Sequence, residues 1–164
     1  MNSLDARRAM CLTFLLCLAH VSAFAADSSS AKDRIRQALL YGIDSQVLEA
    51  IQAIKTSNDT RFTRELTQAL EENKSLDVQT AIFDLFKEQK IRDGEEHGKS
   101  VLAAWVETRD TLLIAAIQYL ASIRSASLAT SLPPVVDAGS NAEALAAIQA
   151  LGTTGDKGAV ALLV

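Results

Sequence analysis

The run Glu95-Glu96-His97 is the first candidate for chemistry in this sequence. Carboxylates and imidazole bind zinc and iron, and they also act as general acids and bases. A zinc or iron site normally needs three or more ligands, whereas His97 is the only histidine after the first 25 residues. Acidic residues are stabilised near a helix N-terminus, so we interpret the run as the solvated start of a helix. We predict no metal ligand, no catalytic residue and no cofactor.

Two further patterns with chemical potential are better explained as structure. Serines are plentiful, but there is no Gly-x-Ser-x-Gly motif and only one candidate histidine base. The run Gly-Thr-Thr-Gly-Asp-Lys at 152–157 lacks the Gly-Lys-Ser/Thr order and the preceding strand of a phosphate-binding loop. We predict that this run is the turn between two helices.

The composition predicts that helices position these residues. The chain has 164 residues, of which 49% are hydrophobic but only 5% aromatic. A core of Ala, Leu, Ile and Val favours closely packed helices, because small side chains let helix axes approach and Ala and Leu are strong helix formers. The two prolines, Pro133 and Pro134, are adjacent, so most of the chain has no helix breaker.

The net charge of −4 and the scattered lysines and arginines give no basic stripe that could follow a phosphate backbone. Nucleic acid is therefore not a predicted partner.

The first 25 residues have the pattern of a secretory signal peptide. Arg7 and Arg8 precede an apolar run over 10–21, and Ala23-Phe24-Ala25 is a small-x-small cleavage site. The apolar run is shorter than the roughly 20 residues of a membrane span. We predict cleavage after Ala25, no membrane span thereafter, and a periplasmic or cell-envelope location, with secretion as the alternative. An uncleaved anchor and a mitochondrial presequence remain as other interpretations.

Both cysteines, Cys11 and Cys17, lie within this predicted signal. The mature chain would then contain no disulfide and no thiolate site, and packing alone would stabilise it. The pair Leu16-Cys17 does not fit a lipoprotein signal, which needs a small residue before the cysteine.

A lone helix is predicted at 32–41, after a flexible lead at 26–31 and before Gly42, a residue that often ends helices. Its polar outward side carries Lys32, Asp33 and Arg36. Such a side suits the terminal cap of a helical array.

A pattern that recurs four times organises the rest of the domain at 32–164. Each copy has a capping residue, then an Ala-Ile pair six residues later, then Ile or Leu three residues after that Ile. The caps are Asp44, Ser75, Asp110 and Asn141. The predicted buried anchors are Ala50, Ile51 and Ile54; Ala81, Ile82 and Leu85; Ala116, Ile117 and Leu120; and Ala147, Ile148 and Leu151.

Each copy is predicted to be a helix pair, with repeats near 44–73, 75–108, 110–138 and 141–164. One pair cannot cover its own apolar faces, but stacked pairs bury them in a continuous core. We therefore predict an all-α fold, an α-solenoid of about four helix pairs after the lone helix. The last pair is unfinished at Val164, so we expect a fragment, an early-terminated array, or an end that docks on another chain or on itself.

Two large apolar side chains are also placed in this core. Trp105, the only tryptophan, is predicted on the buried side of a helix over about 95–108 together with Val106, although such a residue could instead line a partner groove. Leu145 is predicted on the buried side of the last capped helix.

The segment Leu151–Leu163 resembles the junction of HEAT-like repeats of the phycobilisome-lyase type, in which a Leu-Gly-x-x-Gly-Asp turn precedes an Ala-Val-x-x-Leu helix. The resemblance covers roughly Asp44 to Val164 and implies a superhelical stack of antiparallel helix pairs. Nothing in the sequence carries the family's bilin-lyase activity. HEAT-like hydroxylases use His-Glu pairs on several helices, whereas this chain has a single Glu-His.

We therefore predict a non-enzymatic, exported bacterial scaffold or protein-binding module whose second helices line a concave side. The candidate partner-surface residues are Arg61, Arg64, Glu65, Gln68 and Lys99. One alternative is a part of a repeat-built enzyme, similar to a bilin lyase or a metal-dependent hydroxylase, with active residues outside this segment. A purely structural fragment is a third interpretation.

Overall fold

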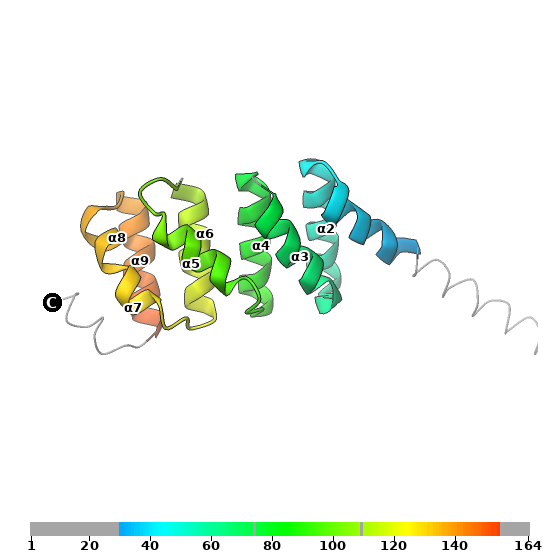
Figure 1. Ribbon diagram of the computed structural model, residues 1–164. Coiled ribbons are helices and arrows are strands. Elements are labelled where there is room, and N and C mark those ends of the chain that lie inside the picture. Colours follow the sequence, from blue (N-terminus) through cyan, green and yellow to red (C-terminus); the bar gives the residue numbers. More distant parts are fainter. Residues whose placement is uncertain (1–29, 74, 109, 155–164) are drawn as a thin grey trace, which may run out of the picture. The chain divides into compact units, whose positions relative to one another are not determined.

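The computed structural model describes residues 30–73, 75–108 and 110–154 (Figure 1). All regular secondary structure in these ranges is helical, which confirms the predicted all-helical class. None of the helices in the described ranges has the length and apolarity needed to cross a membrane. The predicted signal with its cleavage at Ala25, and the predicted helix after Gly155, lie outside these ranges.

The chain divides into two compact units, Met1–Gln37 and Ala38–Val164. Residues 30–41 are helical, which confirms the helix predicted at 32–41 but extends it over Ser30 and Ala31, the last two residues of the predicted flexible lead. The backbone N–H of Gly42 donates to the carbonyl oxygen of Ala38 at 2.9 Å.

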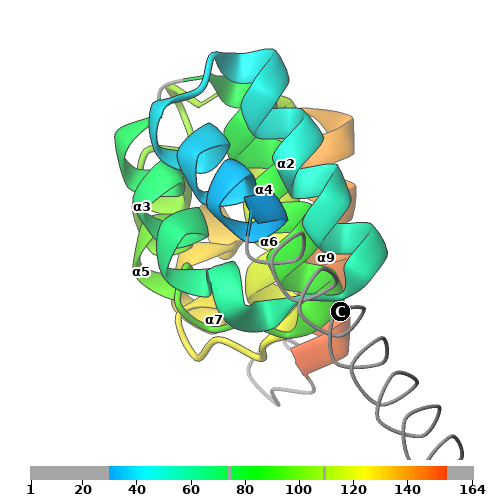
Figure 2. The ribbon, with the colours of Figure 1, turned by 90° about the vertical axis from the view of Figure 1, so that its right-hand side faces the viewer.

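Four helices of the second unit form one layer in chain order (Figures 1 and 2). They are α2 (Asp44–Ser57), α4 (Leu76–Gln89), α6 (Asp110–Ser122) and α9 (Asn141–Thr154). Helix α2 packs against α4, α4 against α6, and α6 against α9. Each capped helix of the sequence pattern therefore lies beside the next one.

Shorter helices form a second layer over the first (Figure 2). They are the 3₁₀ turn η1 (Thr60–Phe62) with α3 (Thr63–Glu72), then α5 (Glu95–Ala103), then α7 (Leu128–Ser131) with α8 (Pro133–Ala138). Helix α3 packs on α4, α5 on α6, and α8 on α9. Pro133 is the first residue of α8, so the two prolines begin a new helix.

Helix α6 lies at the centre of the core, because it contacts α4, α5 and α9. Its residues Leu113, Ile117, Tyr119 and Leu120 are fully buried. A helix covered on several sides must be apolar around most of its circumference, as this one is.

Three helices of the first layer end in the same way. Asn58, Lys90 and Arg124, which follow α2, α4 and α6, have left-handed backbones with φ of 49°, 57° and 53°. In each case the next backbone N–H donates to a carbonyl five residues earlier: Asp59 to Ile54 at 3.2 Å, Ile91 to Phe86 at 3.1 Å, and Ser125 to Leu120 at 3.0 Å. This pattern is the Schellman ending of a helix, which satisfies carbonyls that have no helical partner.

These endings correct the register of the predicted anchors in the second copy. Ile51, Phe83 and Ile117 each precede the left-handed residue by seven positions, and all three are buried. The equivalent of Ala50-Ile51 in α4 is therefore Ile82-Phe83, and Ala81 is only half-buried. The apolar stripe of α4 is broad enough to match the pattern in two registers, one residue apart.

The fourth copy needs a similar correction. The buried residues of α9 include Ala146, Ala147, Ala150 and Leu151, whereas Ile148 is half-buried and Leu145 is 56% exposed. Alanines at the helix contact let α9 approach α6 closely, so the larger side chains turn away from it.

Two of the predicted caps are displaced by one residue. Ile43 and Ser140 precede α2 and α9, so Asp44 and Asn141 are the first helical residues and not the caps. The backbone N–H of Ser140 donates to Oε2 of Glu143 at 2.7 Å, and the N–H of Glu143 donates to Oγ of Ser140 at 3.4 Å. This capping box is what the Ser-x-x-Glu spacing favours.

The other two predicted caps are Ser75 and Asp110. Ser75 is the N-cap of α4, but its side chain makes no capping hydrogen bond. The side chain of Asp110 lies outside the described part.

Two helix ends also differ from the prediction. Helix α5 ends at Ala103, and the chain continues in a turn. The Ala104 carbonyl oxygen accepts the backbone N–H groups of Glu107 at 3.0 Å and Thr108 at 3.1 Å, and it also accepts the Thr108 hydroxyl at 2.8 Å. Trp105 is consequently half-buried in a turn, and Val106 is 76% exposed. Helix α9 continues through Gly152 to Thr154, so Gly152 is helical and does not form the predicted turn.

Candidate functional site

The Glu95 carboxylate is held by hydrogen bonds and ion pairs at the start of α5. The hydroxyl of Ser125 donates to its Oε1 at 2.7 Å, and Lys99 and Arg92 lie 3.6 Å and 3.8 Å from its carboxylate oxygens. The Ser125 hydrogen bond, followed by the charges of Lys99 and Arg92, lowers the pKa of Glu95. Glu95 is therefore anchored to the turn after α6, and it does not extend into solvent.

His97 is not the solvated residue that the sequence predicts. Its ring centroid lies 5.9 Å from that of Phe83, which in turn stacks on Tyr119 at 5.3 Å. Burial lowers the pKa of His97, and the Glu71 carboxylate opposes that shift. Within the described ranges, no group of three His, Cys, Asp or Glu side chains is placed to hold a metal ion. The helix-start interpretation suits Glu96, whose side chain is 88% exposed.

Three of the predicted partner-surface residues lie together. Arg61, Arg64 and Gln68 line one shallow depression of about 570 Å³ on the second layer. Its other lining residues are Thr63, Thr67, Glu71 and Asp93. Spacing of three and four residues along a helix places side chains on one face, so this grouping follows from the sequence.

The side chains in this depression are held to different degrees. Nε of Arg61 donates to Oδ1 of Asp59 at 2.8 Å, a bond that raises the pKa of Arg61. Nε2 of Gln68 donates to Oε1 of Glu72 at 3.0 Å. Arg64 has no ion pair within the described part of the chain, and it is the cation most available to a partner.

The other two predicted residues are not part of the depression. Nζ of Lys99 lies 2.8 Å from Oε1 of Glu96 and 3.6 Å from Oε1 of Glu95, so the acidic start of its own helix holds it. Glu65 is half-buried, and its interactions with other residues are already in place. Of the five predicted partner-surface residues, Arg61, Arg64 and Gln68 line the depression, and Glu65 and Lys99 do not.

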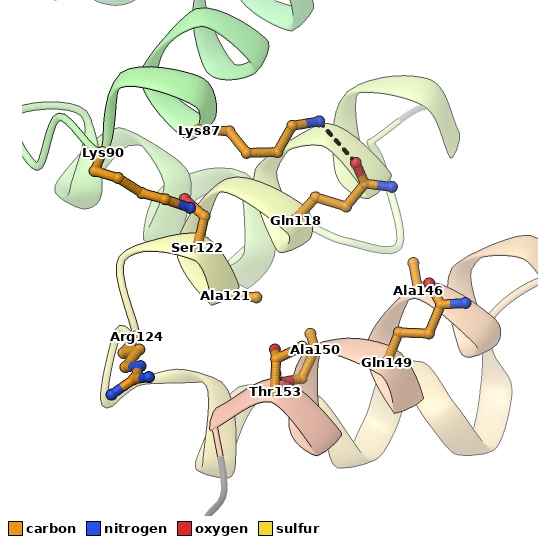
Figure 3. Close-up of a pocket in the computed structure, with 10 residues that line it drawn as sticks. All are labelled: Lys87, Lys90, Gln118, Ala121, Ser122, Arg124, Ala146, Gln149, Ala150 and Thr153. Carbon is orange, nitrogen blue, oxygen red and sulfur yellow. Dashed lines mark hydrogen bonds between the residues drawn. The ribbon is translucent and has the colours of Figure 1, made fainter.

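A second hollow lies at the first layer and is not anticipated by the sequence (Figure 3). We call it the basic groove. It has a volume of about 500 Å³ and is lined by residues of or next to α4, α6 and α9: Lys87, Lys90, Gln118, Ala121, Ser122, Arg124, Ala146, Gln149, Ala150 and Thr153. Lys87 and Lys90 are close in the sequence, but Arg124 follows another helix, so only the helix packing brings the three cations together.

Comparison with known proteins adds no assignment: no protein-family model matches the chain, and no curated protein or solved structure shows significant similarity to it. The resemblance to HEAT-like repeats therefore rests on the sequence pattern alone.

Proposed function

We propose that this chain is a non-catalytic protein-binding module built as a HEAT-like α-solenoid. The order of α2, α4, α6 and α9 within one layer, with α3, α5 and α8 packed over it, supports a stack of helix pairs. The three equivalent Schellman endings support it further, because a repeated unit should end its helices in a repeated way.

The observation that carries the binding function is the depression lined by Arg61, Arg64 and Gln68. Its lining combines two arginines, an amide and two threonine hydroxyls with the carboxylates of Glu71 and Asp93. Protein interfaces are enriched in arginine and use such mixed polar contacts at their rims. A folded protein partner with both acidic and polar side chains fits this surface better than a uniformly charged polymer does.

The proposal includes export. The pattern over residues 1–25 supports delivery to the periplasm or cell envelope of a bacterium, or secretion. The mass of the protein isolated from its native cell tests this point: loss of the first 25 residues is expected, and an intact N-terminus would argue for an anchor.

Affinity capture from the native envelope with the full-length protein tests the binding function. We expect a specific partner that the wild type retains and that Arg61→Glu/Arg64→Glu loses. The charge-matched variant Lys32→Glu/Arg34→Glu should retain it, because these residues lie outside the depression. Equal capture by all three proteins would exclude this surface, and stoichiometric iron or zinc in the purified protein would favour the enzymatic alternative.

A further inference from the structure

We propose that the basic groove binds an extended acidic segment of a partner protein, and that Lys90 and Arg124 recognise its carboxylates. This surface differs from the Arg61–Arg64 depression in layer and in charge, so it does not depend on that part of the proposed function.

The charge of the groove is the first argument. None of its lining residues is acidic, although the chain as a whole carries a net charge of −4. Lys87 is engaged, since its Nζ donates to Oδ1 of Asp84 at 2.6 Å and to Oε1 of Gln118 at 3.0 Å (Figure 3). The side chains of Lys90 and Arg124 have no hydrogen-bonded or ionic partner among the described residues. Two unpaired cations at one hollow attract carboxylates and exclude basic partners.

The backbone at these two cations is the second argument. Lys90 and Arg124 both have positive φ, a conformation that glycine and asparagine adopt more readily than long side chains do. Asn58 occupies the equivalent place after α2. Long cationic residues thus occupy the two endings that border the groove, where asparagine or glycine would suit the backbone better. Strained positions of this kind point to a function for the side chain.

The remaining polar groups select a peptide over a simple anion. The hydroxyl of Ser122 donates to the Tyr119 carbonyl oxygen at 2.7 Å, and that of Thr153 donates to the Ala150 carbonyl oxygen at 2.8 Å. Both protons are used, so these oxygens offer only acceptor lone pairs to the groove. Phosphate near neutral pH has only one or two O–H groups on a single centre to give them, whereas an extended peptide has backbone N–H donors spaced along its length. The side-chain amide of Gln149 can pair with either group.

The shape of the groove fits such a segment. Ala121, Ala146 and Ala150 contribute only methyl groups to its lining. Figure 3 shows Lys87 and Lys90 on one side of the groove and Gln149 and Thr153 on the other. Arg124 lies at the turn that follows α6. The volume of about 500 Å³ lies in the range of roughly 300–1,000 Å³ that is usual for ligand pockets.

Binding of a capped, dye-labelled peptide of alternating Glu and Gly residues to the purified protein tests the proposal by fluorescence anisotropy. The wild type should bind it, and the dissociation constant should rise about tenfold in Lys90→Asn/Arg124→Asn, because two exposed ion pairs are lost. These substitutions place asparagine where its left-handed backbone is well tolerated. The variant should therefore fold, and its denaturation midpoint shows whether it does.

A charge-matched control is Lys32→Asn/Arg34→Asn, which removes two cations outside the groove and should bind like the wild type. Unchanged affinity in the Lys90→Asn/Arg124→Asn protein would overturn the proposal. Equally tight binding of inorganic phosphate or of an oligonucleotide, with the same dependence on Lys90 and Arg124, would also overturn it, since the site would then select charge alone. Arg61→Glu/Arg64→Glu should leave peptide binding intact, which separates this result from the test of the other surface.

Discussion

The hydroxyl of Ser125 donates a 2.7 Å hydrogen bond to the carboxylate of Glu95 and thereby ties the turn after α6 to the first residue of α5. Ser125 is only 3% exposed, so water cannot readily replace the bond. Ser125→Ala should lower the free energy of unfolding by about 1.5 kcal/mol, as is usual for a hydrogen bond to a charged group. Urea denaturation measures the change, and NMR titration should show a higher pKa for Glu95.

Ser100→Ala is the control for that prediction. Its hydroxyl donates to the Glu96 carbonyl oxygen on the exposed side of the same helix, so its removal should have a smaller effect. Equal losses of unfolding free energy in the two variants would mean that the Ser125–Glu95 hydrogen bond stabilises the fold no more than an exposed hydroxyl bond does.

Two helical glycines should respond in opposite directions to alanine. A Cβ at Gly98 would lie 3.2 Å from Cδ2 of Leu120, whereas a Cβ at Gly152 would meet no atom of the described residues within 4 Å. Gly152→Ala should stabilise the protein by about 1 kcal/mol through helix propensity. At Gly98 the gain is the same, but overpacking of the buried Leu120 costs roughly 1–3 kcal/mol, so we expect a net loss. Thermal denaturation of both variants measures the two changes. A stabilised Gly98→Ala protein would contradict the prediction and show that Leu120 can shift to make room for the added methyl group.

These glycines illustrate which parts of the fold the sequence can predict. The helical class follows from the composition and the local residue types, and the structure confirms it. Whether a glycine lies in a turn or inside a helix depends on what packs against it. Gly152 was therefore wrongly predicted as a turn. The register of Ile82-Phe83 likewise depends on the contact of Phe83 with Tyr119 on α6.

The two candidate surfaces also differ in how far the sequence predicts them. Arg61, Arg64 and Gln68 are spaced by three and four residues along η1 and α3, so helical periodicity predicts their proximity. The basic groove joins Lys90 to Arg124 and Thr153 across three helices, and no local pattern brings these residues together. The capping box of Ser140 and Glu143 is a feature that the sequence analysis missed although its signal is local, because the Ser-x-x-Glu spacing is visible in the sequence.

His97 should make stability fall as the pH drops below about 6.5. Burial lowers its pKa in the folded state from the ordinary value of 6.5, so the unfolded chain binds the proton first. The stability due to neutral His97 is complete above that pH and is lost as the pH falls through the folded pKa. The lowered pKa of Glu95 acts in the same direction only below its ordinary value of 4.5. Between pH 6.5 and 5 the loss therefore belongs to His97.

Denaturation midpoints measured across this window check the prediction. His97→Phe should flatten the pH dependence between these values. Glu71→Gln should steepen it, because the carboxylate that opposes the downward pKa shift is removed. A slope that persists in His97→Phe would assign the effect to another group.

Two glutamines of α4 should respond with opposite sign to methionine, which has a similar shape but no amide. Both amide atoms of Gln89 are buried without a hydrogen-bond partner among the described residues. Nε2 of Gln79, by contrast, donates to the Asn73 carbonyl oxygen at 2.7 Å. An unpaired buried polar group carries a desolvation penalty of about 1–3 kcal/mol, so Gln89→Met should stabilise the protein by about 1 kcal/mol or more.

Gln79→Met is the matched variant and should destabilise by about 1 kcal/mol, because it removes a bond that closes the connection between α3 and α4. Chemical denaturation of the two proteins side by side compares them at nearly constant side-chain volume. A loss of stability in Gln89→Met would contradict the prediction. It would mean that the Gln89 amide has a hydrogen-bond partner, such as an ordered water, and that this bond stabilises the C-terminal end of α4.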